Sequence, residues 1–307
     1  NIFISILFYL KPLRKIFVDY SFKNKFVVFK FDHWNDQHPQ GCLVSTIGDT
    51  SHLESFYEYQ LYCKSLHDSM TRMTQDARTA LNRVPIESFV SGIRTRYDTK
   101  EEVGVIFSID PPHSLDFDDA FRVTVTDADT VQVSIYIANV VFWLEALDLW
   151  NSLSNRVATI YLPDRRRPML PTVLSDSLCS LQEREDRFAL VCDLVVQNAH
   201  IVSAAFRLAH VRVSKNYRYE EPDLLRFRDY QTLFRLTQEL DRNCKDSHDV
   251  VQFWMVEMNA RCAQHLSRNG LGIFRSVSVA AASSSVDDAI QTLSESCRRT
   301  LQLWNNT

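Results

Sequence analysis

Two strand-like runs with a proline break between them are the feature that most limits which folds this chain can adopt. Residues 103–109 and 121–125 are rich in β-branched and aromatic side chains, a composition typical of β-strands. Pro111 and Pro112 interrupt the chain between the two runs. The connection carries four aspartates within ten residues: Asp110, Asp116, Asp118 and Asp119. We expect these carboxylates to lie at the strand ends and on one connecting loop.

Four carboxylates on one loop repel one another unless a cation neutralises them or water reaches every oxygen. Asp116 and Asp118 point the same way along an extended chain, and Asp119 joins them only if the backbone bends. Oxygen ligands without a nearby thiol favour Mg²⁺ or Mn²⁺ over Zn²⁺. A calcium EF-hand is excluded because the sixth position from Asp116 is Phe121 instead of Gly, and the twelfth is Asp127 instead of Glu. The residues leave two hypotheses open, a divalent-metal site and a solvated acidic loop.

The hydrophobic pattern along the rest of the chain predicts a mixed α+β fold. Strands are expected at residues 26–31, 131–137, 189–196 and 204–213. Helices are expected at residues 52–78, 142–159 and 248–268, with a further helix from Ser285 toward Trp304. The first ten residues are apolar but too few to cross a bilayer, which takes about 20 residues, so we expect a buried strand or part of a truncated element.

Composition excludes several classes of protein. The 307 residues, 45% of them apolar and 23% charged, are enough for a substantial core and two domains. A formal net charge of −4 argues against a uniformly basic surface, so an RNA path would need local basic clusters. The seven cysteines are odd in number and never two residues apart, which favours a reducing compartment over a disulfide framework or a zinc knuckle. The six glycines form no phosphate-binding loop, and no serine lies in a G-x-S-x-G turn, which disfavours kinases, dehydrogenases and esterases.

Four sequence blocks resemble one known enzyme family. The aspartate segment, residues 108–120, is similar to the signature of the ribonuclease II / ribonuclease R (RNB) family, whose catalytic domain also occurs in the catalytic subunit of the eukaryotic exosome. The second block comprises residues 156–163, 167–171 and 174–181, the third comprises 217–220 and the fourth 255–259. These blocks follow one another in the family's order and approximate spacing.

The resemblance implies a 3′→5′ hydrolytic exoribonuclease that degrades single-stranded RNA to 5′-mononucleotides. Asp110, Asp116, Asp118 and Asp119 fall on family positions that bind or organise metal, and Asp118 is expected to matter most for the chemical step. A pair of Mg²⁺ ions, or Mn²⁺, would neutralise the phosphate, activate water and stabilise the leaving oxygen.

The resemblance also implies substrate-binding residues. Tyr161 matches the family tyrosine that packs against the 3′-terminal nucleotide, and Tyr219 matches a second aromatic near the same end. Arg165, Arg166 and Arg167 follow Tyr161 and are candidates for phosphate contacts. The alternatives are a core tyrosine and a solvated basic turn.

The chain departs from the family pattern at three places. Tyr136-Ile137-Ala138-Asn139 stands where members usually have His-Ile-Ala-Asp, and Gln252-Phe253 replaces a common acidic pair. The arginine-bearing S-P-I-R-R-Y-like motif does not occur before Thr307. A second hypothesis is therefore a weak or inactive RNA-binding scaffold in a larger RNA-processing complex.

The resemblance predicts a portion of a longer protein. We expect part of a cold-shock or OB-type β-barrel at residues 1–50, a helical linker at 51–85, and an RNB-type mixed-sheet catalytic domain with surrounding helices at 86–307, truncated at its C-terminal end. The expected partners are single-stranded RNA and an exosome-like or other RNA-processing complex, with no membrane. The expected location is intracellular, in the cytoplasm, the nucleus or the mitochondrion.

Overall fold

The computed structural model describes residues 24–35, 40–127, 129–153, 156 and 158–274. The apolar first ten residues and the helix expected from Ser285 lie outside the described residues. The chain divides into two compact units, Asn1–Trp254 and Met255–Thr307. Within the described ranges, none of the helices has the length and apolar character needed to cross a membrane.

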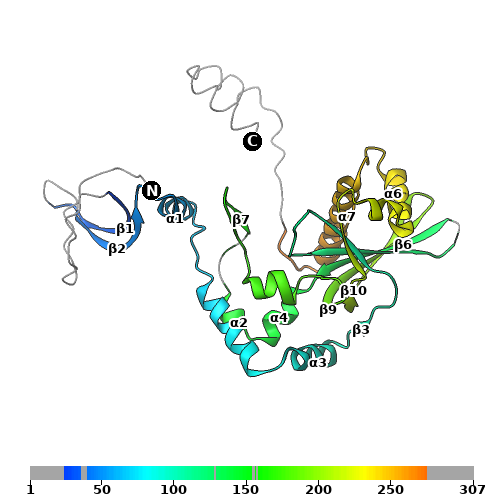
Figure 1. Ribbon diagram of the computed structural model, residues 1–307, viewed down its shortest axis with the longest axis horizontal. Coiled ribbons are helices and arrows are strands. Elements are labelled where there is room, and N and C mark those ends of the chain that lie inside the picture. Colours follow the sequence, from blue (N-terminus) through cyan, green and yellow to red (C-terminus); the bar gives the residue numbers. More distant parts are fainter. Residues whose placement is uncertain (1–23, 36–39, 128, 154–155, 157, 275–307) are drawn as a thin grey trace, which may run out of the picture. The chain divides into compact units, whose positions relative to one another are not determined.

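The described residues begin with a strand pair and three helices (Figure 1). β1 (Lys25–His33) confirms the strand predicted at residues 26–31 and pairs antiparallel with β2 (Gln40–Asp49). Three helices follow: α1 (Leu53–Cys63), α2 (Thr71–Arg83) and α3 (Ile86–Tyr97). The single helix predicted at residues 52–78 is wrong. Ser65 has a left-handed backbone with φ of 57°, and the Ser69 hydroxyl accepts a hydrogen bond from the Thr71 N–H (3.2 Å), so the chain breaks and restarts there.

A seven-stranded mixed sheet is the main element of the first unit (Figure 1). Its strands lie in the order β11-β4-β5-β6-β9-β10-β3. They are β3 (Lys100–Glu101), β4 (Phe107–Asp110), β5 (Asp119–Val125), β6 (Thr130–Ala138), β9 (Asp186–Gln197), β10 (His200–Arg212) and β11 (Lys215–Arg218). β11 and β3 run parallel to their neighbours, and the other pairs are antiparallel. The α+β class and most of the strands predicted from the sequence are thereby confirmed.

The strand predicted to begin at Val103 begins at Phe107 instead. Gly104 has a φ of +128°, which favours glycine, and the Val103 carbonyl accepts a hydrogen bond from the Arg122 guanidinium (2.8 Å). Residues 103–105 therefore cover an arginine and are not paired in the sheet.

Shorter elements connect the strands. They are α4 (Val140–Ala146), η1 (Trp150–Ser152), β7 (Ile160–Tyr161), β8 (Arg166–Arg167), the π-helix η2 (Leu174–Leu178), α5 (Pro222–Arg226), α6 (Arg228–Leu240) and α7 (Ser247–Arg268). α7 confirms the helix predicted at residues 248–268, and the boundary between the two units falls within it. The helix predicted at residues 142–159 is wrong beyond Ala146. Leu147 and Leu149 are both buried, which two positions of one helix spaced two apart do not achieve, and Asp148 between them is left-handed (φ 52°).

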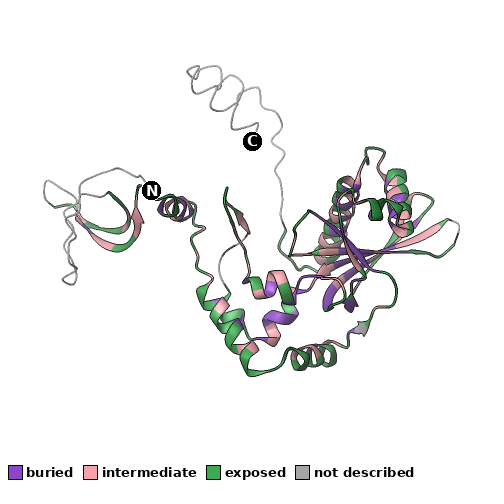
Figure 2. Cartoon of the chain, in the orientation of Figure 1, coloured by how far each residue is buried: buried purple, intermediate pink, exposed green. Residues whose placement is uncertain are grey.

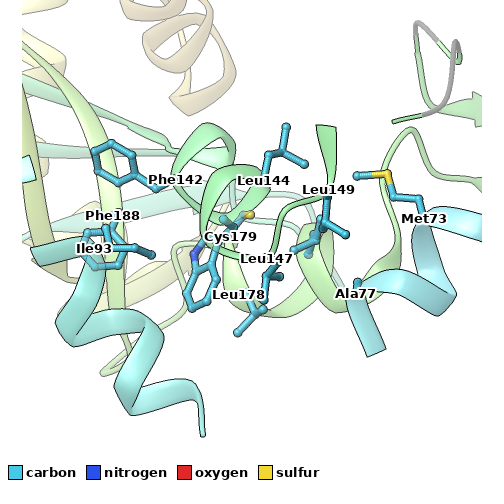
Figure 3. Close-up of a cluster of buried hydrophobic side chains, with 12 residues drawn as sticks. Met73, Ala77, Ile93, Phe142, Leu144, Leu147, Leu149, Leu178, Cys179 and Phe188 are labelled. Carbon is cyan, nitrogen blue, oxygen red and sulfur yellow. The ribbon is translucent and has the colours of Figure 1, made fainter. Parts of the chain in front are cut away.

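Two groups of buried side chains stabilise the first unit. One lies against the sheet and includes Ile106, Tyr136, Leu181 and Val211. The other joins α2, α3, α4, η2 and Phe188 of β9, as Figure 3 shows. β4 and much of β9 are buried, whereas α2 and α3 keep much exposed surface (Figure 2). The second group anchors η2 to the core through Leu174 and Leu178.

Candidate active site

The aspartate loop joins two neighbouring strands of the sheet. Asp110 ends β4 and Asp119 begins β5. The Ser180 hydroxyl accepts a hydrogen bond from the Phe117 N–H (3.0 Å) and donates one to the Leu115 carbonyl (2.8 Å). The Ser180 side chain thus holds two main-chain groups of the loop, and Asp110 and Asp119 lie at the two strand ends that the loop joins.

Asp110 is buried and Asp119 is partly buried. Asp110 is only 8% exposed, and each of the two residues has a buried Oδ2 without a hydrogen-bond partner. Burial raises the pKa of Asp110 to about 6, although a hydrogen bond from Ser108 acts in the opposite direction. Burial and the neighbouring charge of Asp110 raise the pKa of Asp119 to about 7. Buried oxygens without partners are costly for the fold, and a cation would stabilise them.

Asp116 and Asp118 have different surroundings. Asp116 forms an ion pair with Arg166, with 2.6 Å between Oδ2 and Nη1. Asp118 is exposed, and its carbonyl accepts a hydrogen bond from the Ala138 N–H (2.9 Å). Although the Asp118 side chain reaches solvent, surrounding protein atoms raise its pKa, and the charge of Asp116 adds to the effect. Asp118 is therefore the most exposed of the four carboxylates.

The donor chemistry fits a divalent cation. Carboxylate oxygens are hard ligands of the kind that Mg²⁺ and Mn²⁺ prefer, and two of them here are buried without partners. As they stand, no three His, Cys, Asp or Glu side chains in the described part of the chain are grouped closely enough to hold one metal ion. Mutual repulsion and the pull of Arg166 on Asp116 both oppose convergence of these carboxylates. The set is thus electrostatically connected without being assembled in advance.

Tyr161 lies on the β7–β8 hairpin with its side chain 77% exposed. The alternative that it is a core residue is therefore wrong. The three arginines that follow are all engaged with carboxylates. Arg165 pairs with Asp164 (2.7 Å) and with Glu54 of α1. Arg167 pairs with Glu58, also on α1.

Arg166 is the arginine that points to the aspartate loop. It pairs with Asp116 through Nη1 and with Asp176 of η2 through Nη2, at 2.6 and 2.7 Å. Arg165, Arg166 and Arg167 stay candidates for phosphate contacts, and a phosphate would have to compete with the carboxylates that they already bind.

Tyr219 reaches the same corner from a distant part of the sequence. β11 runs parallel to β4 with Arg218 opposite Asp110, and the Tyr219 N–H donates to the Asp110 carbonyl (3.1 Å). Burial raises the pKa of Tyr219 to about 12, with the charges of Asp119 and Asp110 adding to it. Its ring already stacks on His248, with centroids 3.6 Å apart. The structure thus brings Tyr219 to the buried aspartates, with one ring face already occupied.

Three further residues support the site and were not singled out from the sequence. Asp176 and Ser180 lie within the block at residues 174–181, so the resemblance contained a signal for them. The Asn216 amide donates to the Ser108 hydroxyl (2.7 Å) and to the Leu181 carbonyl (3.0 Å), which ties β11, β4 and the chain after η2 together. No periodicity in the sequence points to such a role.

Comparison with known proteins agrees with this geometry. Residues 96–229 match the family model of the RNB domain. This part of the chain is an RNB domain. A probable exosome complex exonuclease RRP44 of Caenorhabditis elegans is 29% identical over 210 residues, which cover 64% of this chain and 21% of that protein. Exoribonuclease 2 of Cronobacter sakazakii is 39% identical over 102 residues, which cover 32% of this chain and 16% of that protein.

The RNB domain and the segments around it share a fold with a solved structure. Mycoplasma genitalium RNase R in complex with double-stranded RNA superposes with a TM-score of 0.69 and 16% identity, covering 93% of this chain and 57% of that chain. The chain thus spans about a fifth of the length of the first of these curated relatives.

Two departures from the family pattern are integrated into the RNB domain as structural residues. Tyr136 is fully buried, and its hydroxyl donates to Glu102 (3.0 Å), which also pairs with Arg122 (2.8 Å). The Asn139 side chain accepts a hydrogen bond from the Phe142 N–H (3.2 Å) and caps α4, a role that Asp fills equally well. Neither replacement removes a carboxylate from the aspartate loop.

Proposed function

We propose that this chain is the catalytic part of a metal-dependent exoribonuclease that hydrolyses single-stranded RNA from its 3′ end and releases 5′-mononucleotides. The observation that carries the proposal is that Asp110 and Asp119 each have a buried Oδ2 without a hydrogen-bond partner, at one corner of an RNB-domain sheet. We also propose that the RNB-type catalytic domain extends over residues 86–307, after a barrel segment at 1–50 and a helical linker at 51–85.

In this proposal, Asp110, Asp116, Asp118 and Asp119 hold Mg²⁺ or Mn²⁺. When bound, such ions supply charge neutralisation at the phosphate and an activated water. The partly dry surroundings of Asp110 and Asp119 favour their protonated forms, and they also strengthen the attraction between the ionised carboxylates and a cation, which would displace the proton. Asp118, which solvent reaches, orients the attacking water at the scissile phosphate. Asp116 must share its carboxylate with Arg166.

Substrate contacts follow from exposure. Tyr161 stacks on a base at the 3′ end, since its ring is exposed, and such stacking contributes about 1–3 kcal/mol per base. Tyr219 limits the depth to which the terminal nucleotide enters. Arg165 and Arg167 reach phosphates only by leaving Glu54 and Glu58. The parent protein acts inside the cell, alone or within an exosome-like complex.

The test compares Asp118→Asn with the wild-type full-length protein on single-stranded RNA with an accessible 3′ end. We expect mononucleotide release that requires Mg²⁺ or Mn²⁺, stops in EDTA, and falls at least about 100-fold in the variant, as for loss of a positioned acid–base group. Asp76→Asn is the matched control, because Asp76 is an exposed aspartate on α2. Unchanged release by Asp118→Asn at an unchanged melting temperature would refute the assignment of the site.

A second candidate function is RNA binding without hydrolysis. It is favoured by one observation, that the carboxylates in the described residues are not grouped as a ready-made ligand set. RNA binding by intact protein with no release of nucleotides in either Mg²⁺ or Mn²⁺ would establish this alternative.

A further inference from the structure

The Arg166 guanidinium joins two parts of the site that the proposed function treats separately. Its residue lies on β8, directly opposite Tyr161 of β7. One arm, Nη1, binds Asp116 of the aspartate loop, and the other arm, Nη2, binds Asp176 of η2. The three charged side chains are between 16% and 30% exposed, so solvent screens these pairs less than pairs on the open surface.

Asp176 is the fixed end of this connection. Its second carboxylate oxygen accepts a hydrogen bond from the Ser175 hydroxyl (2.6 Å), and its carbonyl accepts one from the Gln182 amide (2.8 Å). On either side of it, Leu174 and Leu178 are buried in the core group shown in Figure 3. Asp176 is therefore anchored between two core residues, whereas the β7–β8 hairpin has only two residues in each strand.

Only one of the two partners of Arg166 is also a candidate metal ligand. Asp116 belongs to the carboxylate set that suits a divalent cation, whereas Asp176 is not one of the four loop aspartates. A cation that binds Asp116 weakens the ion pair between Arg166 and Asp116, and it leaves the ion pair between Arg166 and Asp176 unaffected. An arginine with two separate acceptors can thus stay at the site when one acceptor is taken.

We propose that Asp176 is a positioning residue: through Arg166 it keeps the β7–β8 hairpin, with Tyr161, next to the aspartate loop whether or not Asp116 is engaged by a cation. Only the part of this inference that concerns RNA and the cation rests on the proposed function. This role of Arg166 differs from phosphate binding, because Arg166 joins the β7–β8 hairpin to Asp116 and Asp176.

Amide hydrogen exchange of residues 160–167 in the full-length protein tests the connection directly. In EDTA, Asp176→Asn replaces the ion pair of Arg166 Nη2 by at most a neutral hydrogen bond, and we expect exchange of the hairpin amides to rise about threefold. With saturating Mn²⁺, the cation competes with Arg166 for Asp116. Hairpin exchange should then rise at least about tenfold, within the range of coupling between contacting charges. Wild type should change less than twofold on adding Mn²⁺. Exchange in β9 and β10 should stay unchanged in every variant.

Conservative and matched variants separate this role from a general loss of structure. Asp176→Glu keeps the charge and should restore most of the protection, whereas Glu54→Gln removes only a contact of Arg165 and should not make exchange depend on Mn²⁺. On single-stranded RNA, Asp176→Asn should raise KM about fivefold with kcat within twofold. A purely structural defect would lower kcat through a smaller folded fraction.

The outcomes are separable. Hairpin exchange that is the same in Asp176→Asn and wild type, with and without Mn²⁺, overturns the inference, and so does a KM that stays unchanged in an active enzyme. If wild type neither binds Mn²⁺ in calorimetry nor degrades RNA, the proposed function fails, and the exchange measured in EDTA still decides whether Asp176 holds the hairpin.

Discussion

The buried aspartate at the end of β4 makes a prediction about stability whose sign depends on pH. Replacing Asp110 by Asn removes an ionisable group whose pKa burial raises from 3.8 to about 6. The folded protein therefore holds this proton more tightly than the unfolded chain, and its stability falls as the pH rises from about 4 to about 6. Above that range the wild type carries the full penalty of a buried charge, and Asp110→Asn does not.

The size of the effect follows from the same values. A rise from 3.8 to about 6 corresponds to about 3 kcal/mol once the group is ionised, at about 1.4 kcal/mol for each tenfold change. The asparagine amide would also be buried at a position where Oδ2 has no partner. This lowers the free energy of unfolding of the variant by about 1–2 kcal/mol. We expect Asp110→Asn to be about 1–2 kcal/mol more stable than wild type at pH 7.5, and to be equal or less stable at pH 4.

Urea unfolding in EDTA at these two pH values measures the difference, with the exposed Asp76→Asn as control. Adding Mn²⁺ at pH 7.5 should reverse the order. A ligand at about 100 times its Kd contributes about 2.7 kcal/mol to the folded protein, and Asp110→Asn should gain much less. The reasoning would be contradicted if Asp110→Asn destabilised the protein equally at pH 7.5 and at pH 4 in EDTA. That result would mean that the buried charge of Asp110 is already compensated.

Two further predictions concern residues on either side of the site. Tyr161→Ala should leave the melting temperature unchanged, because the side chain is 77% exposed, and should weaken RNA binding about tenfold, as measured by fluorescence anisotropy; equal affinity would argue against stacking. Asn139→Ala should lower the free energy of unfolding by about 1 kcal/mol through loss of the cap of α4, and Asn139→Asp should restore it, as measured by urea unfolding; a loss with Asp equal to that with Ala would show that the family aspartate has another role here.

The strands were predictable because their pattern is local. Alternating or continuous β-branched and aromatic residues mark β5, β6, β9 and β10, and the structure has strands at each place. Helix breaks were harder to predict. The left-handed residues Ser65 and Asp148 interrupt stretches of acceptable helix propensity, since burial of neighbours such as Leu147 and Leu149 decides the local backbone.

The sequence indicated candidate members of the site, but it said much less about the contacts between them. The density of carboxylates and the resemblance together indicated the aspartate loop. Which carboxylate Arg166 binds depends on how the β7–β8 hairpin and η2 approach the loop, and neither approach is encoded in spacing along the chain. The same holds for the stacking of Tyr219 on His248, which joins residues from separate elements.

The parallel pairing of β11 with β4 has a consequence for biosynthesis. Asn216 and Ser108, which are hydrogen-bonded across this pair, are 108 positions apart in the sequence. Contacts between such distant segments form late, because a long loop must close before they contribute any stability. A growing chain thus carries the aspartates well before it has the strand that completes their surroundings, and the corner that contains them is finished only after residue 219 has left the ribosome.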